Sequence, residues 1–173
     1  MNLSQLAEQL KNGSITLAEW QASMREYLRA EYTTAMILAK GGREFVTAAD
    51  WGFVGSELKK QYQYLDQFAQ DIVNDPNKWL WGDNLLNRMN LYKDSAYSSL
   101  ADMLAREAAA AGFTEERNEL GTADHCDECL QETAKSWQPI GSLIPIGERI
   151  CIVKCKCTLR YRKQLADGSY VYG

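Results

Sequence analysis

The residues of this chain that are best suited to chemistry lie close together in its last third. All five cysteines and the only histidine fall within one window, and no cysteine precedes it. The pattern is Cys-x2-Cys, a gap of 21 residues, and then Cys-x3-Cys-x-Cys. Two pairs of sulfurs from distant segments can build the thiolate tetrahedron that zinc prefers in structural sites. The spacing therefore predicts a structural metal site with zinc as its cofactor.

The sequence leaves open which four cysteines hold the metal. Cys126 and Cys129 form the first pair, and three further sulfurs compete for the two remaining places. Alternate residues of a regular strand share one face, so Cys155 and Cys157 are the favoured second pair. Cys151 either replaces one of them or packs as a small apolar side chain. Buried cysteines without metal and disulfides formed on oxidation are the alternatives to a metal site.

The cysteine window offers little for catalysis. His125 directly precedes Cys126, and adjacent side chains rarely point at one substrate atom, so we expect a ligand, a residue that supports a ligand, or a plain structural histidine. A His-Glu-x-x-His site needs two histidines, and a zinc deaminase needs a glutamate two positions after its histidine. Four thiolate ligands leave no open position for water. We expect a protein that is not an enzyme, with zinc-dependent catalysis as the least favoured alternative.

Length and composition are those of an ordinary soluble globular protein. The chain has 173 residues, 46% of them hydrophobic and 24% charged, which suits one domain, or one domain with a small appendage. Its formal net charge of −4 argues against a protein whose main task is to coat nucleic acid. Residues 145–163, however, carry six basic side chains against one acidic side chain. This stretch is either a solvated strand face or a local contact for an acidic surface or phosphate; the candidate DNA contacts are Lys154, Lys156, Arg160 and Arg162.

Two absences bear on where the protein works. The chain does not begin with basic residues followed by an apolar run, the pattern of a signal peptide. It also has no apolar stretch that approaches the length of about 18 residues that a membrane helix needs. We therefore expect a protein made in a reducing cytosol, without a membrane partner, where thiols stay reduced or bind metal.

Helices are expected to form most of the chain before the cysteine window. Capping-box patterns begin at Thr16 and at Thr47, and apolar residues at spacings of three and four follow each of them. A third stripe of this kind stops at Gly112. Three helices of roughly 24–28 residues with short connections predict an antiparallel bundle over residues 1–112. A short extra helix is expected at about residues 3–11.

The residue pattern changes after the third stripe. Glycine, proline and β-branched residues become common, and residues 158–162 alternate as a strand does. Asp167-Gly168 is typical of a tight turn, and residues 170–172 can form the returning strand. We therefore predict a mainly α-helical protein in which residues 117–173 form a small, β-rich, zinc-binding module.

The cysteine window also resembles that of a known group of proteins. It is similar to the C-terminal module of the phage Mu F-like minor head proteins, which are head morphogenesis proteins of tailed bacteriophages. Apart from His125 and the cysteines, the similar positions are Trp137, Pro139, Gly141, Pro145, Gly147, Leu159 and Tyr161. A helical segment that includes Gly41-Gly42 and Thr47-Ala48-Ala49-Asp50-Trp51-Gly52 resembles one in phage and prophage proteins with the same module. The resemblance covers roughly residues 41–72 and 121–162.

This resemblance implies a structural or assembly protein of the phage virion. It would work in several copies near the portal vertex or inside the head, with portal, connector or capsid proteins as partners. It would be located in the virion and, during assembly, in the host cytoplasm. The alternative function is a nucleic-acid-binding zinc module that contacts packaged DNA.

Overall fold

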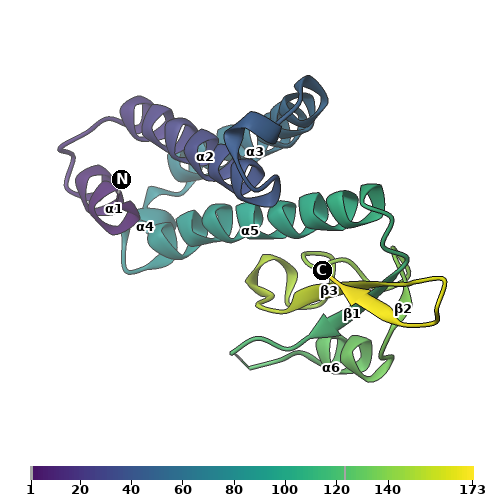
Figure 1. Cartoon of the computed structure of the whole chain (residues 1–173). Coiled ribbons are helices and arrows are strands. Elements are labelled where there is room, and N and C mark those ends of the chain that lie inside the picture. Colours follow the sequence, from purple (N-terminus) through teal and green to yellow (C-terminus); the bar gives the residue numbers. More distant parts are fainter. Residues whose placement is uncertain (1, 123) are drawn as a thin grey trace. The chain divides into compact units, whose positions relative to one another are not determined.

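A computed structural model describes residues 2–122 and 124–173 of the chain. Over these residues the protein is 61% helical, with six α-helices and one small antiparallel sheet (Figure 1). This confirms the predicted mainly helical fold with strands after the last long helix. The helices are α1 (Leu3–Lys11), α2 (Leu17–Ala39), α3 (Ala48–Asn74), α4 (Pro76–Leu80), α5 (Asn84–Ala110) and α6 (Asp127–Ala134). The strands are β1 (Glu115–Glu119), β2 (Gln138–Pro139), β3 (Thr158–Gln164) and β4 (Tyr170–Tyr172).

The chain forms two compact units. The first, here the helical unit, comprises Met1–Leu38 and Gly42–Ala96, and the second, the cysteine unit, comprises Ala39–Gly41 and Tyr97–Gly173. The boundary falls inside α5, so the second half of this helix belongs with the sheet. The predicted division at residues 112–117 follows the change in composition instead, and independent folding of those two parts stays a prediction.

Helices α2 and α3 of the helical unit begin with the predicted capping boxes. At α2, Thr16 Oγ1 accepts from Glu19 N at 3.2 Å, and Glu19 Oε2 accepts from Thr16 N at 2.7 Å. At α3, Thr47 and Asp50 make the same reciprocal bonds. These bonds satisfy amide groups that a helix start otherwise leaves unpaired.

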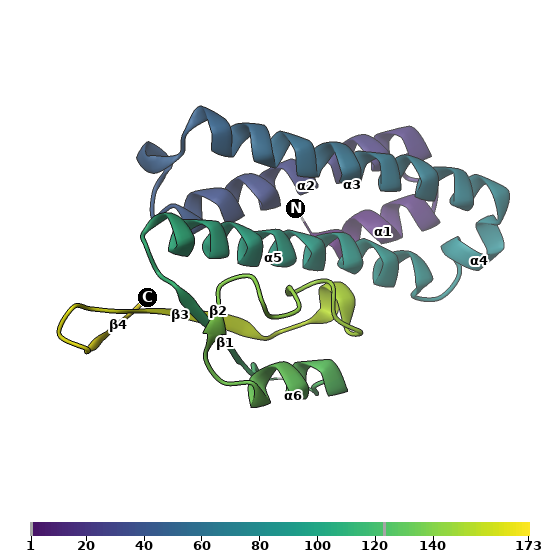
Figure 2. The same ribbon diagram turned by 90° about the vertical axis from the view of Figure 1, so that its right-hand side faces the viewer.

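Aromatic side chains hold α2, α3 and the first half of α5 together. Trp20 meets Phe68 edge-on at 5.8 Å between ring centroids, and Phe68 lies 6.4 Å from Tyr92. These three side chains are almost fully buried. Helix α3 runs antiparallel to α2 and to α5, which lie on either side of it in the chain (Figure 2). The apolar stripes of the sequence therefore form one core.

The connection after α3 contains a short helix, because Pro76 opens α4. Proline lacks an amide hydrogen, so it ends α3, yet its fixed φ suits the first position of a new helix. Asp75 Oδ1 caps α4 by accepting from Lys78 N at 3.0 Å. Trp79 packs edge-on against Phe68 at 4.8 Å, which adds this segment to the core of the helical unit.

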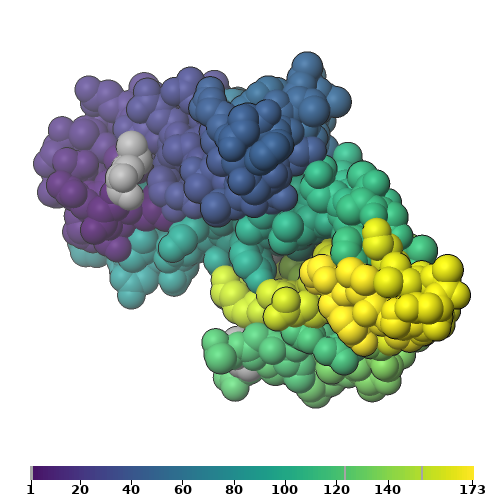
Figure 3. All heavy atoms as spheres, viewed as in Figure 1, coloured from purple at the N-terminus to yellow at the C-terminus, as the bar shows by residue number. Residues whose placement is uncertain are grey.

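The sheet of the cysteine unit has the strand order β2-β1-β3-β4, and all of its pairs are antiparallel. The register of β1 and β3 sets Glu116 opposite Tyr161, and both side chains are buried. The predicted hairpin is present, with Gly168 at φ +86° in the turn before β4. The residues of β4 lie on the surface, in yellow in the space-filling view (Figure 3).

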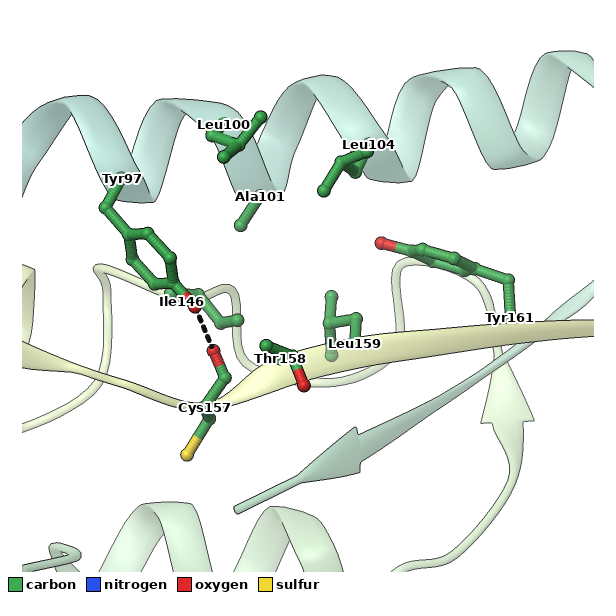
Figure 4. Close-up of a pocket in the computed structure, with 9 residues that line it drawn as sticks. All are labelled: Tyr97, Leu100, Ala101, Leu104, Ile146, Cys157, Thr158, Leu159 and Tyr161. Atoms are coloured by element: carbon green, nitrogen blue, oxygen red, sulfur yellow. Dashed lines mark hydrogen bonds between the residues drawn. The ribbon is translucent and has the colours of Figure 1, made fainter. Parts of the chain in front are cut away.

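The second half of α5 packs beside β3 and the loop that precedes the last cysteines. Tyr97, Ala101 and Leu104 of α5 line a small apolar gap together with Leu159 and Tyr161 (Figure 4). Tyr97 and Ala101 of this helix also pack against the cluster of buried residues that includes Cys129, Cys155 and Cys157. Among the described residues, no helix is both long enough and apolar enough to cross a membrane.

Candidate metal centre

The fold brings all five cysteines into one cluster, and all five thiols are free. The Sγ of Cys129 lies 3.5 Å from that of Cys126, 3.6 Å from that of Cys151 and 3.6 Å from that of Cys155. Four sulfurs at about 2.3 Å from one tetrahedral zinc ion are about 3.8 Å apart. The observed separations are within a few tenths of an ångström of this value, so the cluster could hold a metal ion.

Cys129 is the centre of the cluster. The sulfurs form two groups of three within 4.8 Å of one another, Cys126 with Cys129 and Cys151, and Cys129 with Cys155 and Cys157. Cys129 belongs to both groups and is 1% exposed. All five predicted ligands therefore meet, and the choice of four among them stays a prediction.

The start of α6 positions the first pair of cysteines. Cys126 is the N-cap of α6 and Cys129 lies in its first turn. The backbone amide of Cys129, with that of Cys151, lowers the pKa of the Cys126 thiol to about 7. Helix N-termini favour thiolates in this way. Burial raises the pKa of Cys129 and of Cys151.

A short 3-10 helix, η2 (Ile152–Lys154), positions the second group of cysteines. Cys151 is its N-cap and Cys155 follows its end. Ile152 has φ +48°, a left-handed conformation that β-branched residues rarely adopt, and it forms the turn between the two cysteines. The strand expected at Cys155 and Cys157 begins only at Thr158. Both cysteines are nevertheless buried.

Two close contacts fix the segments that carry the sulfurs. Tyr97 of α5 donates its hydroxyl to the backbone carbonyl of Cys157 at 3.1 Å, while the sulfur of Cys157 points away from α5 (Figure 4). Gly121 lies against the backbone of Lys156, where a Cβ atom would sit 2.0 Å from the carbonyl oxygen. The loop before α6 and the segment before β3 can therefore approach only because residue 121 is glycine.

His125 lies outside both groups of three sulfurs. Its Nε2 is 2.9 Å from the carbonyl oxygen of Gly121. The ring thus contacts the loop backbone, which favours the structural role among those left open by the sequence. A direct ligand role would need its other ring nitrogen.

Arg149 and Asn118 are parts of the site that sequence reasoning missed. Arg149 is 1% exposed, and its Nη1 lies 2.8 Å from Asn118 Oδ1 and 3.8 Å from Cys129 Sγ. In the sequence Arg149 is one of six basic residues in a charged stretch, and no signal separates it from the others. For Asn118 the only signal is its place on the inward face of β1, two residues from buried Glu116.

Other cations of the basic stretch are engaged within the cysteine unit. Arg160 Nε bonds Glu119 at 3.0 Å, and Arg162 Nε bonds Glu115 at 2.7 Å. Lys163 donates to the backbone carbonyl of Ala111, directly after α5, at 2.8 Å. The stretch is therefore built largely of paired cations and not of a continuous row of free ones.

A cavity of about 400 Å³ opens on the outer face of the sheet. Its lining comprises Arg117, Glu119, Trp137, Arg160, Tyr172 and Gly173. The guanidinium of Arg117 lies 4.9 Å from the Trp137 ring centroid, and both lining arginines bond Glu119. The cavity thus combines cations and aromatic rings, and Glu119 balances part of the positive charge of the two arginines.

Comparison of the chain with known protein families, with curated proteins and with solved structures gave no match.

Proposed function

We propose that four thiolates of the cysteine cluster bind one structural zinc ion. The observation that carries this proposal is that the free sulfur of Cys129 has three other free sulfurs at 3.5–3.6 Å, a separation close to that in a tetrathiolate site, and shares a second group of three with Cys157. When bound, zinc supplies a cross-link between the start of α6 and the η2–β3 segment. Hard-cation sites use oxygen ligands instead, so the donor set favours a soft metal.

The core of the cysteine unit gives a physical reason for such a cross-link. Around the cluster, the fully buried apolar residues are Cys129, Ile146, Cys155 and Cys157. Three of these four are cysteines, and elsewhere in the described part of the cysteine unit the buried apolar residues are Met103, Ala108, Leu143 and Tyr161. Small modules with little apolar core are commonly stabilised by a metal, and metal binding then contributes directly to folding.

We further propose that the protein has a structural role and not an enzymatic one. Four thiolate ligands leave no free coordination position, and the histidine of the window contacts backbone. The resemblance of the cysteine window to phage minor head proteins supports a component of a tailed-phage head or its connector. In that role the protein would dock on portal or capsid subunits in several copies.

Metal analysis tests the zinc site. Purified full-length protein should contain about one zinc per chain by elemental analysis, since one tetrathiolate centre takes one ion. Removal of zinc by a chelator should destabilise the protein to thermal unfolding, because the metal contributes to folding. A protein that holds no metal, and melts identically with and without chelator, would overturn the zinc proposal.

Particle analysis tests the assembly role separately. In a lysogen whose prophage carries the gene, the protein should be detected by mass spectrometry in purified heads or head precursors. Deletion of the gene should lower the yield of DNA-filled heads, and the wild-type gene should restore it. Absence of the protein from all particles, together with an unchanged yield after deletion, would contradict this role.

A nucleic-acid-binding role is the second candidate, and the outer face of the sheet favours it. Arginines beside aromatic rings, as around Trp137, can bind single strands through phosphate contacts and base stacking. Retention of the protein on single-stranded DNA should then fall steeply with salt. Binding that is absent at low salt would rule this role out.

A further inference from the structure

The cysteine cluster lies against a buried arginine. Arg149 is 1% exposed, although arginine is almost never fully buried without a partner. Its Nε donates to the Ile144 carbonyl at 2.9 Å, and its Nη1 donates to Asn118 Oδ1 and towards Cys129 Sγ. The carbonyl and the amide oxygen are neutral acceptors. Among the contacts that Arg149 makes with described residues, only the one with the sulfur can carry a negative charge.

No carboxylate pairs with Arg149 in the part of the chain that the structure describes. Glu116, which is also buried, accepts instead from two backbone amides of the loop after β2. Glu132 is buried as well and bonds Lys135 at 2.6 Å. The Nη2 atom of Arg149 is buried without a hydrogen-bond partner. The guanidinium charge therefore lacks a carboxylate counter-ion at contact distance.

The charge of a metal–thiolate centre would supply that counter-ion. A buried cation is strongly unfavourable unless an opposite charge lies close to it. Neutral thiols or a disulfide carry no charge, so neither would balance Arg149. A zinc ion with four thiolates carries two net negative charges, and one of them would be offset by the guanidinium.

Asn118 connects the arginine to the helix that carries Cys129. Its side-chain Nδ2 donates to Thr133 Oγ1 at 2.7 Å and to the Cys129 carbonyl at 3.3 Å. The same amide presents Oδ1 to Arg149. One buried polar network thus connects β1, α6 and Arg149 around the sulfur of Cys129.

We propose that Arg149 is a positioning residue that balances the negative charge of the metal–thiolate centre and orients Cys129 within it. This inference rests on the proposed zinc site. The negative charge of the metal–thiolate centre would stabilise the buried guanidinium of Arg149, and the guanidinium would in turn stabilise the bound metal. Zinc affinity should therefore depend on a side chain that does not touch the metal.

Three substitutions in the full-length protein test this role. Arg149→Met removes the charge but keeps much of the volume, Arg149→Lys keeps the charge, and Arg160→Met is the matched control. Arg160 is a suitable control because its side chain is 61% exposed and pairs with Glu119 in the same unit. Zinc affinity is measured by competition with a chelator, and folding at saturating zinc by circular dichroism.

We expect Arg149→Met to weaken zinc binding by about 10–100-fold, as other substitutions around metal ligands do. Arg149→Lys should stay closer to the wild type, and Arg160→Met should match it. Unchanged affinity in a folded Arg149→Met would overturn the inference, because carboxylates farther away would then balance the charge. An equal loss in both Arg149 variants would also overturn it, because charge would not be the cause.

The design separates this inference from the zinc proposal itself. If wild-type protein binds no zinc, the proposed site fails. If wild-type protein binds zinc and Arg149→Met binds it equally well, only the role of Arg149 fails. Should Arg149→Met not fold at saturating zinc, Arg149→Lys decides alone: retained affinity supports the charge role, and a loss of tenfold or more, on the order expected for such residues, overturns it.

Discussion

Single cysteines differ in how much the proposed metal centre depends on them. Cys129 belongs to both groups of three sulfurs, and its backbone carbonyl also accepts from Asn118. Cys151, Cys155 and Cys157 offer three sulfurs for two places beside the first pair. Because one sulfur is spare, each of these three cysteines can be partly replaced as a ligand by the others. No other cysteine can take the place of Cys129.

Cys129→Ala should therefore be the most damaging single cysteine substitution. Removal of the shared sulfur leaves neither group of three intact, so we expect loss of stoichiometric zinc. Cys157→Ala is the matched comparison, because Cys126, Cys129, Cys151 and Cys155 still offer four thiolates, and it should keep about one zinc per chain. Elemental analysis after desalting gives both values. Zinc retention by Cys129→Ala equal to that of Cys157→Ala would contradict a shared centre.

Secondary-structure elements depend on local chemistry at their ends. The α2 start is held by Glu19 and Thr16, and the hydrogen bonds from the Thr16 backbone and side chain lower the pKa of Glu19 below its ordinary value of 4.5. The segment before α6 depends instead on the close passage of Gly121 beside Lys156. The start of α2 therefore depends on an electrostatic interaction, and the segment before α6 depends on a steric one.

The α2 cap should make stability depend on pH. Because the native pKa of Glu19 is lowered, its carboxylate stabilises the fold above about pH 4.5, and this contribution is lost as pH falls through the native pKa. Glu19→Gln should be less stable than the wild type near neutral pH, and the difference should disappear once the pH lies below the native pKa of Glu19. Urea unfolding followed by circular dichroism at several pH values measures it. A difference that grows on acidification would contradict the assignment.

Gly121→Ala should destabilise the cysteine unit. The added Cβ would meet the Lys156 carbonyl oxygen at 2.0 Å, so one of the two backbone segments must move. Overpacking of this kind typically costs about 1–3 kcal/mol. Gly52→Ala is the control, because a Cβ there meets nothing within 4 Å and alanine favours the helix interior. Urea denaturation of both zinc-loaded variants gives the comparison, and equal stabilities would show that the loop adjusts freely.

The molecule as a whole consists of two units that share α5. The helical unit has an aromatic core with several large buried side chains, whereas the smaller core of the cysteine unit includes three buried cysteines. The two units should therefore respond differently to loss of a metal. We expect the residues that respond to metal loss to begin near Ala96, where the boundary between the two units crosses α5.

Chelation of zinc should increase hydrogen exchange mainly in residues 97–173. The cross-link is lost there, while residues 1–96 keep their apolar core. Peptide-resolved hydrogen exchange with and without chelator measures the effect, and circular dichroism should keep most of its helical signal. Cys126→Ser or Cys129→Ser should act in the same direction. Loss of helicity over the whole chain would contradict the two-unit organisation.

Much of the fold could be predicted because its signals are local. The three long helices follow from apolar spacing and end at glycine or proline, and their starts follow from capping residues such as Thr16 and Thr47. The hairpin around Gly168 is local in the same sense. The helices α4 and α6 escaped prediction, because each is short and is held by tertiary packing or by the cysteine cluster.

The sequence by itself determined that five thiols share one window, because cysteine type and spacing are properties of the chain. Only the tertiary structure decided that Cys129 is their centre, that Cys151 lies among the others, and that Arg149 is buried beside them. The physical reason is that distances between sulfurs, and the burial of a charge, depend on how distant segments pack. No local pattern distinguishes a buried arginine from its solvated neighbours.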